Sequence, residues 1–154
     1  MHSRFGYDNV GFHLSDNIVT MDFNGVLTAD EVREVETAVN EVIVKNLPVE
    51  ITYPSKEELK TLDYRSKIEI EGQVRIVTIP GVDVCACCAP HVKKTGEIGM
   101  LNVQSLSNYK GGVRISILSG FRALEEERKK SQVISSISGT LSANQELLPE
   151  LVEK

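Results

Sequence analysis

The sequence predicts an α+β fold in which a mostly antiparallel sheet packs with helices and a helical extension follows. Three observations predict it: strand-like and helix-like segments are mixed without regular βαβ alternation, turn-forming residues join consecutive strands, and the composition becomes helical after Gly120. With 154 residues, 41% of them hydrophobic, the chain is long enough to bury one main core. We expect a core domain over residues 1–120 and the helical extension over residues 121–154.

The first quarter of the chain predicts a hairpin followed by a helix. Residues 11–14 and 18–23 have strand patterns, and the serine, aspartate and asparagine between them favour a turn. Thr28 and Glu31 then have the spacing of a capping box, which satisfies the first free amides of a helix. Valines recur every three or four residues after it, so the helix is expected to run to about Lys45.

The middle of the chain predicts further strands and a helical turn. Residues 48–53 form a short strand pattern, and Ser55 with Glu58 offers a second capping box for a helical turn. Residues 68–71 and 73–79 are rich in alternating or β-branched apolar side chains, which favours two more strands on either side of a glycine.

The last third of the chain predicts a second hairpin and then helices. Residues 98–106 and 113–118 have strand patterns, joined by turn formers at 108–112. After Gly120 an apolar stripe of leucine, valine and isoleucine indicates a long helix. A last helical segment is expected to begin near Ser142, whose spacing to the following glutamine resembles a capping box.

The composition excludes several classes of protein. No apolar run approaches the roughly 18 to 20 residues of a membrane span, and the first ten residues lack the apolar block of a signal peptide. All three cysteines lie between Cys85 and Cys88, so they cannot build the long-range disulfides of a secreted domain. We therefore expect a cytoplasmic protein without membrane contact, whose thiols are available for a metal or for catalysis.

Positive charge is concentrated in one part of an acidic chain. The formal net charge is −5, yet residues 84–122 carry +4 and the rest of the chain carries −9. These cations are either a few solvated side chains or a phosphate-facing strip, because neutralising phosphates dominates the affinity of proteins for nucleic acids. The candidate phosphate-binding residues within this stretch are Lys93, Lys94, Lys110, Arg114 and Arg122.

The stretch CACCAPHVKKTGEIG, residues 85–99, contains the residue types that perform chemistry. Cys87 and His91 stand four residues apart, and a thiolate with an imidazole is a good zinc pair, although zinc needs three or four protein ligands. Two other interpretations stay open: a cysteine nucleophile activated by His91, and a tight turn without chemistry. Further ligands could come from residues near the pair or from the distant histidines, namely Cys85, Cys88, Asp83, His2 and His13.

Three motifs together resemble one family. CCAPHVKKTGEIG (residues 87–99), GGVRISILSG (111–120) and GFHLSDNIVTMDFNG (11–25) are similar to the editing domain of alanyl-tRNA synthetases and to free-standing alanyl-tRNA editing proteins. The editing domain of threonyl-tRNA synthetases has a similar core. The resemblance extends to about Leu124, and the family pattern C-G-G-T-H-V-x-x-T-G-E-I-G is matched at Cys87, His91, Val92, Thr95, Gly96, Glu97, Ile98 and Gly99.

The resemblance implies hydrolysis of the ester that links a wrong amino acid, serine or glycine, to tRNA for alanine. It implies zinc as the cofactor, with Cys87 and His91 as two ligands, and it makes Thr95 and Glu97 candidate catalytic residues. Thr95 would alternatively cap the turn, and Glu97 would alternatively pair with a nearby cation. The partner would be the acceptor end of alanine tRNA, bound by the cations named above.

The sequence departs from the family pattern in two places. Cys88, Ala89 and Pro90 replace the small Gly-Gly-Thr, and the H-x-x-x-H pair that supplies two further zinc ligands is absent. We therefore expect a fragment that lacks the front of the domain, retains zinc weakly and has little activity. The alternatives are a non-catalytic tRNA-binding module and the editing part of a full alanyl-tRNA synthetase. The charged terminal helices would suit a homodimer interface or remain unassociated.

Overall fold

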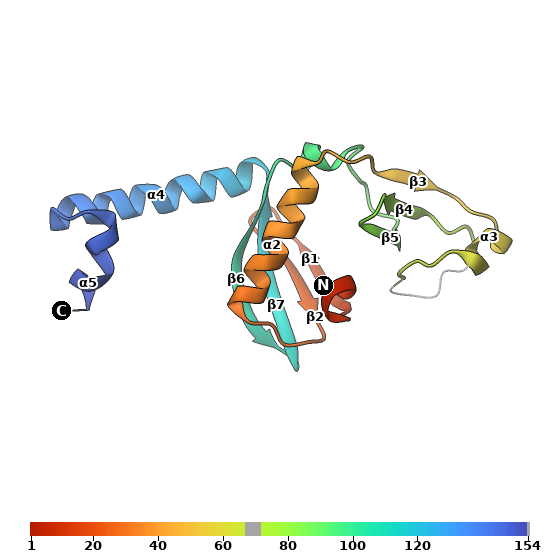
Figure 1. Cartoon of the computed structure of the whole chain (residues 1–154), viewed down its shortest axis with the longest axis horizontal. Helices are drawn as coiled ribbons and strands as arrows, with labels where there is room; N and C mark the ends of the chain where they lie inside the picture. The colour runs from red at the N-terminus through yellow and green to blue at the C-terminus, as the bar shows by residue number, and fades with distance from the viewer. Residues whose placement is uncertain (67–71, 154) are drawn as a thin grey trace.

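The computed structural model describes residues 1–66 and 72–153. Within these residues the chain forms a four-stranded and a three-stranded sheet, with helices that pack on them or extend from them (Figure 1). Every pair of neighbouring strands in both sheets is antiparallel. The α+β prediction is therefore confirmed. None of the described helices is both long and apolar enough to cross a membrane.

The larger sheet has the strand order β1-β2-β7-β6. Its strands are β1 (Asn9–Leu14), β2 (Val19–Phe23), β6 (Leu101–Tyr109) and β7 (Gly112–Ser119). Both predicted hairpins are confirmed, because β1 pairs with β2 and β6 pairs with β7. The second hairpin turns within two residues that both have positive φ, 48° at Lys110 and 81° at Gly111, as in the tight turns that match strand twist.

The strand predicted over residues 98–106 begins later, at Leu101, and this boundary was wrong. Residues Thr95–Ile98 form a short 3₁₀ helix, η1. It ends at Gly99, whose φ of 80° lies in the region that glycine tolerates best. This backbone conformation redirects the chain from η1 into β6, which the apolar pattern alone did not reveal.

Helix α2 (Ala29–Val44) begins where the capping box predicts. The Thr28 hydroxyl accepts the Glu31 amide at 3.2 Å, and the Glu31 carboxylate accepts the Thr28 amide at 2.8 Å. The Glu31 carboxylate also accepts a hydrogen bond from the Thr28 hydroxyl, and the two bonds it accepts from the Thr28 amide and hydroxyl lower its pKa because they favour the charged form. The helix lies across one face of the larger sheet, next to β6 (Figure 1). The buried core beneath it contains Phe23, Leu27, Val32, Val113 and Ile115.

Side chains of α2 also cover the outer edge of β6. The side-chain Nδ2 of Asn40 donates to the Leu101 carbonyl at 2.8 Å, and its Oδ1 accepts a hydrogen bond from the Leu101 backbone amide at 2.9 Å. The Glu36 carboxylate accepts the Val103 amide at 2.5 Å. An uncovered edge strand would expose these backbone groups to pairing with another chain, so the two side chains both satisfy the backbone and protect the edge.

The smaller sheet has the order β3-β4-β5 and lies to the side of the larger one (Figure 1). It consists of β3 (Glu50–Thr52), β4 (Ile76–Ile79) and β5 (Asp83–Ala86), with α3 (Lys56–Thr61) between the first two strands. The second predicted capping box is confirmed at the start of α3. The strand predicted over residues 68–71 lies outside the described residues.

The C-terminal part is helical, as predicted, and α4 (Phe121–Leu141) extends away from the larger sheet (Figure 1). The last helical segment expected near Ser142 is present but begins at Gln145, and the capping-box role of Ser142 was wrong. Ser142 ends α4 in a left-handed conformation, and η2 (Gln145–Leu147) and α5 (Leu148–Val152) follow it. The chain begins with a single helical turn, α1 (His2–Phe5). The domain division at residue 120 stays a prediction.

Candidate functional site

The cysteine cluster lies at the end of the smaller sheet. Cys85 is part of β5 and pairs with Val77 of β4. The Cys87 amide donates to the Arg75 carbonyl at 3.1 Å, so the pairing of the two strands continues just past the end of β5. Cys85 and Cys87 are half-buried, whereas Cys88 is exposed. The chain thus reaches Cys87 on a fixed backbone and only then enters the loop that carries His91.

Arg75 holds this loop together. Its Nη1 donates to the carbonyl oxygen of Cys87 at 2.5 Å and to that of Ala89 at 3.1 Å. The same nitrogen is 3.4 Å from His91 Nδ1. One guanidinium therefore contacts the two residues of the predicted zinc pair, at the backbone carbonyl of Cys87 and at the ring of His91. The sequence analysis did not select Arg75, which comes from the segment before β4.

The His91 ring is oriented by a second contact. Its Nδ1 lies 2.7 Å from the carbonyl oxygen of Ala89. A carbonyl oxygen only accepts, so Nδ1 carries the proton in this hydrogen bond. The Arg75 nitrogen is also a donor, so it lies close to Nδ1 without forming a hydrogen bond to it. In the neutral imidazole, Nε2 then keeps its lone pair. A backbone carbonyl on one ring nitrogen commonly prepares the other nitrogen of a histidine to bind a metal or accept a proton.

The thiols differ in their surroundings. Burial and the Asp83 carboxylate raise the pKa of the Cys85 thiol, which makes this cysteine a poor nucleophile at neutral pH. All three cysteines are free thiols. The backbone carbonyl of Cys87 is bound by the arginine that also contacts His91, and the role of the Cys87 thiol stays a prediction.

The donor chemistry of Cys87 and His91 suits zinc, but the set is incomplete. Within residues 1–66 and 72–153 no group of three or more histidine, cysteine, aspartate or glutamate side chains could hold a metal ion. Cys85, Cys88 and Asp83, predicted as possible further ligands, therefore do not complete a metal site with Cys87 and His91. Zinc stays a prediction for this chain, and no chemical step is derived through it.

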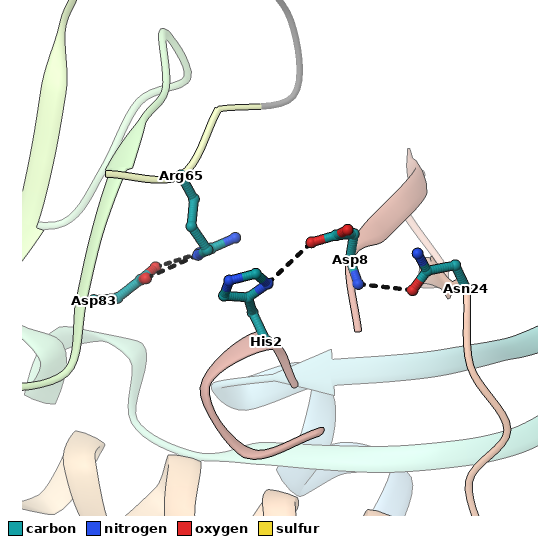
Figure 2. Close-up of polar contacts among 5 residues, drawn as sticks. All are labelled: His2, Asp8, Asn24, Arg65 and Asp83. Carbon is teal, nitrogen blue, oxygen red and sulfur yellow. Dashed lines mark hydrogen bonds and ion pairs between the residues drawn. The ribbon is translucent and has the colours of Figure 1, made fainter. Parts of the chain in front are cut away.

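The two remaining histidines have other surroundings. His2 Nδ1 lies 2.9 Å from the Asp8 carboxylate, and Figure 2 shows its ring turned toward that carboxylate. His13 lies in β1 opposite Thr20 of β2 and is exposed. Neither belongs to a described metal-binding group. The structure therefore does not bring either histidine into a metal site with the predicted pair.

The N-terminus nevertheless lies close to β5. In Figure 2 the Arg65–Asp83 ion pair is drawn beside the His2 ring, and Arg65 Nε donates to Asp83 at 3.0 Å. The Met1 amino group is near this pair, and burial and the positive charge of Arg65 lower its pKa. The Asn24 side chain accepts the Asp8 amide at 2.8 Å and so fixes the partner of His2.

Thr95 is buried and its hydroxyl is engaged within the fold. The hydroxyl donates to the Val42 carbonyl at 2.8 Å and accepts the Leu47 amide at 2.9 Å. The Thr95 amide in turn donates to the Leu47 carbonyl at 2.9 Å. With 1% of its surface exposed, Thr95 connects η1 to the end of α2. This geometry matches the alternative in which Thr95 caps a turn, and its catalytic role stays a prediction.

Glu97 has a local partner. Its carboxylate accepts the Lys94 backbone amide at 3.1 Å, at the start of η1. Glu97 itself is exposed. The carboxylate therefore stabilises the 3₁₀ turn, and nothing in this contact prevents a further role in proton transfer, which stays a prediction.

The five predicted tRNA-binding cations lie at two ends of the larger sheet. Lys93 and Lys94 precede η1 and Arg122 follows β7, all near the end where β6 begins (Figure 1). Lys110 is in the β6–β7 turn at the other end, and the nine residues of β6 separate the two by about 30 Å. The cations therefore form no single continuous strip.

Arg114, the remaining cation, is held by partners within the sheet. It forms two hydrogen bonds of 2.7 and 2.8 Å to the carboxylate of Asp22, and its guanidinium lies 3.8 Å from the centre of the Tyr109 ring. The guanidinium lowers the pKa of Asp22. Arg122 donates to the carbonyl of Asp16 at 3.0 Å, in the β1–β2 turn. Both arginines are thus partly occupied by the fold.

Comparison with known proteins agrees with these motifs. Residues 74–116 match the family described as the threonyl and alanyl tRNA synthetase second additional domain. That segment is similar to part of such a domain. It contains β4, the cysteine cluster, η1 and most of the β6–β7 hairpin, and thus Arg75, Cys87 and His91. The resemblance predicted from the motifs is therefore confirmed.

Longer alignments extend the similarity to most of the chain. An alanine–tRNA ligase from Thermotoga maritima is 38% identical over 133 residues, which cover 84% of this chain and 15% of the ligase. One from Petrotoga mobilis is 33% identical over 130 residues, or 82% of this chain and 15% of the ligase. The alanyl-tRNA editing protein AlaX-L from Pyrococcus horikoshii is 29% identical over 153 residues, which are 97% of this chain and 37% of that protein. The chain thus spans a minor part of each relative.

Proposed function

We propose that this chain serves the editing of mischarged alanine tRNA, by hydrolysis of the ester that links serine or glycine to the tRNA. The observation that carries the proposal is the similarity to an alanyl-tRNA editing protein over 97% of the chain, together with the family match that contains Cys87 and His91. The relatives named alanine–tRNA ligase are consistent with the same role inside a longer enzyme.

The residues of the loop have defined parts in this proposal. His91 Nε2, freed by the hydrogen bond from Nδ1 to Ala89, accepts a proton or binds a metal. Arg75 positions the loop through the carbonyls of Cys87 and Ala89. A zinc ion, when bound, would polarise a water or the ester carbonyl, with Cys87 and His91 as two of its ligands. Glu97, which is exposed, would take part in proton transfer, whereas Thr95, whose hydroxyl is bound within the fold, would hold the following turn in place.

The proposal is tested by measuring release of labelled serine from seryl-tRNA for alanine, with zinc added over a concentration series. We expect slow release above the rate in buffer, because two protein ligands bind zinc weakly. Cys87→Ser and His91→Ala should each remove it. Cys88→Ser, which changes the exposed neighbouring thiol, is the matched control and should keep the rate. Release at the buffer rate by the unaltered chain, or undiminished release by Cys87→Ser and His91→Ala, contradicts the proposal.

A second candidate is a tRNA-binding module without catalysis. The incomplete metal-ligand set within the described residues and the structural hydrogen bonds of Thr95 favour it. The same assay separates the two candidates when tRNA binding is measured in parallel. Salt-sensitive binding without serine release supports the module, whereas release that depends on Cys87 and His91 excludes it.

A further inference from the structure

Lys45, which the sequence analysis did not select, lies at the same corner of the fold as Lys93 and Lys94. Two backbone contacts bring the segments together: the Val49 amide donates to the Lys93 carbonyl at 2.9 Å, and Pro48 forms an isolated bridge with Lys94. Lys45 is the C-terminal cap of α2, directly before this paired segment. The lysines are therefore neighbours although 48 positions separate Lys45 from Lys93 in the sequence.

The buried hydroxyl of Thr95 holds this corner in place. It joins the Val42 carbonyl, in the last turn of α2, to the Leu47 amide in the loop that follows. Thr95, which follows Lys94, is thus hydrogen-bonded to the chain on both sides of Lys45. A cluster of cations on such a fixed backbone loses less freedom on binding than the same charges on a mobile loop.

The three lysines are also electrostatically available. All three side chains are exposed, and none takes part in an ion pair found among residues 1–66 and 72–153. Two carboxylates lie nearby: Glu97 accepts the Lys94 backbone amide, and Glu41 precedes Lys45 by one helical turn. Arg114 is different, because Asp22 already neutralises it. Free cations rather than paired ones attract phosphates.

We propose that Lys45, Lys93 and Lys94 form a phosphate-binding corner that takes the backbone of the tRNA next to its acceptor end. This inference rests on the proposed function and adds Lys45 to the nucleic-acid contacts. Lys93 is two residues from His91, so phosphates bound at the corner are adjacent to the loop that Arg75 positions. A tRNA whose end reaches His91 must carry its nearest phosphates through this part of the surface.

The test measures binding of uncharged alanine tRNA to the chain by fluorescence anisotropy across a salt series. Lys45→Ala should weaken binding about threefold or more at low salt and lower the slope of log affinity against log salt by about 1, as for the loss of one phosphate contact. Lys45→Arg should preserve both values. Lys129→Ala removes the same charge from α4, outside the corner, and should change neither. Glu97→Gln should strengthen binding.

The outcomes separate this inference from the proposed function, because uncharged tRNA has no ester to hydrolyse. Equal affinities for Lys45→Ala and Lys129→Ala, an unchanged salt slope, or no binding by the unaltered chain would each overturn the corner. Weaker tRNA binding by Lys45→Ala, without any release of serine from seryl-tRNA, supports the corner and rejects the hydrolase. Release of serine, with tRNA binding unchanged in Lys45→Ala, supports the hydrolase and rejects the corner.

Discussion

The two halves of the motif from Cys85 to Gly99 are built differently. In the second half, Thr95 is buried, and its hydroxyl binds both the end of α2 and the loop after it. In the first half, His91 is exposed, and the loop from Cys87 to His91 is held mainly through Arg75. One half is therefore anchored by a buried residue at the end of α2, whereas the other is a surface loop at the end of the smaller sheet.

This difference separates residues that build the fold from residues that are free for chemistry. Groups with all their hydrogen bonds made inside the protein contribute to stability, and leaving their partners unpaired is costly. Exposed groups oriented by a single neighbour contribute little to stability but keep an open ring nitrogen or thiol. Thr95 belongs to the first class and His91 to the second, although only four positions separate them in the motif.

The largest expected effect is on stability, from Thr95→Val. Valine has the same shape but no hydroxyl, so the Val42 carbonyl and the Leu47 amide lose their partner in a buried place. We expect a loss of about 3 kcal/mol in the free energy of unfolding, from two unsatisfied groups. Urea denaturation followed by circular dichroism measures it. Thr95→Ser keeps the hydroxyl and should cost clearly less; equal losses for the two variants would contradict the role of these hydrogen bonds.

A moderate effect is expected at acidic pH from the Asp22–Arg114 pair. Because Arg114 lowers the pKa of Asp22, the pair's contribution to stability is complete above 3.8, the ordinary aspartate value, and is lost as the pH falls below it toward the lowered pKa. The urea midpoint should therefore fall more between about pH 6 and about pH 3 in the unaltered chain than in Asp22→Asn. Parallel pH profiles would contradict this role for Arg114.

Much of the fold could be predicted because its signals are local. The capping boxes at Thr28 and Ser55 need only residues three positions apart, and both are present. The same spacing misled the analysis at Ser142, where the hydroxyl follows a long helix and the backbone is left-handed with a φ of 48°. A capping-box spacing does not distinguish the start of one helix from the end of the previous one.

The site could be predicted only in part. Cys87 and His91 are neighbours in sequence, so their chemistry was visible. Arg75 was missed because its contacts with Cys87, Ala89 and His91 depend on the pairing of the chain around β4 with β5, 12 to 16 positions away. An arginine beside a strand has many uses, and its sequence context gives no sign of this one.

The smallest effect on stability, yet the most informative for the site, is expected from Arg75→Ala. The carbonyl of Ala89 is exposed and that of Cys87 is only part-buried, so water can replace the guanidinium and the free energy of unfolding should fall by only about 1 kcal/mol. Because Arg75 also holds the Ala89 carbonyl, its removal should let that carbonyl move away from Nδ1, and the His91 ring should then exchange between tautomers. Nitrogen-15 spectra of the imidazole report this as a shift of Nε2 away from its unprotonated value.

Arg75→Lys is the control, because it keeps the charge but not the planar set of donors, and its Nε2 shift should be intermediate. Unchanged imidazole spectra in Arg75→Ala would show that the exposed half of the motif is ordered without its arginine, and the contrast with Thr95 would then be one of burial alone.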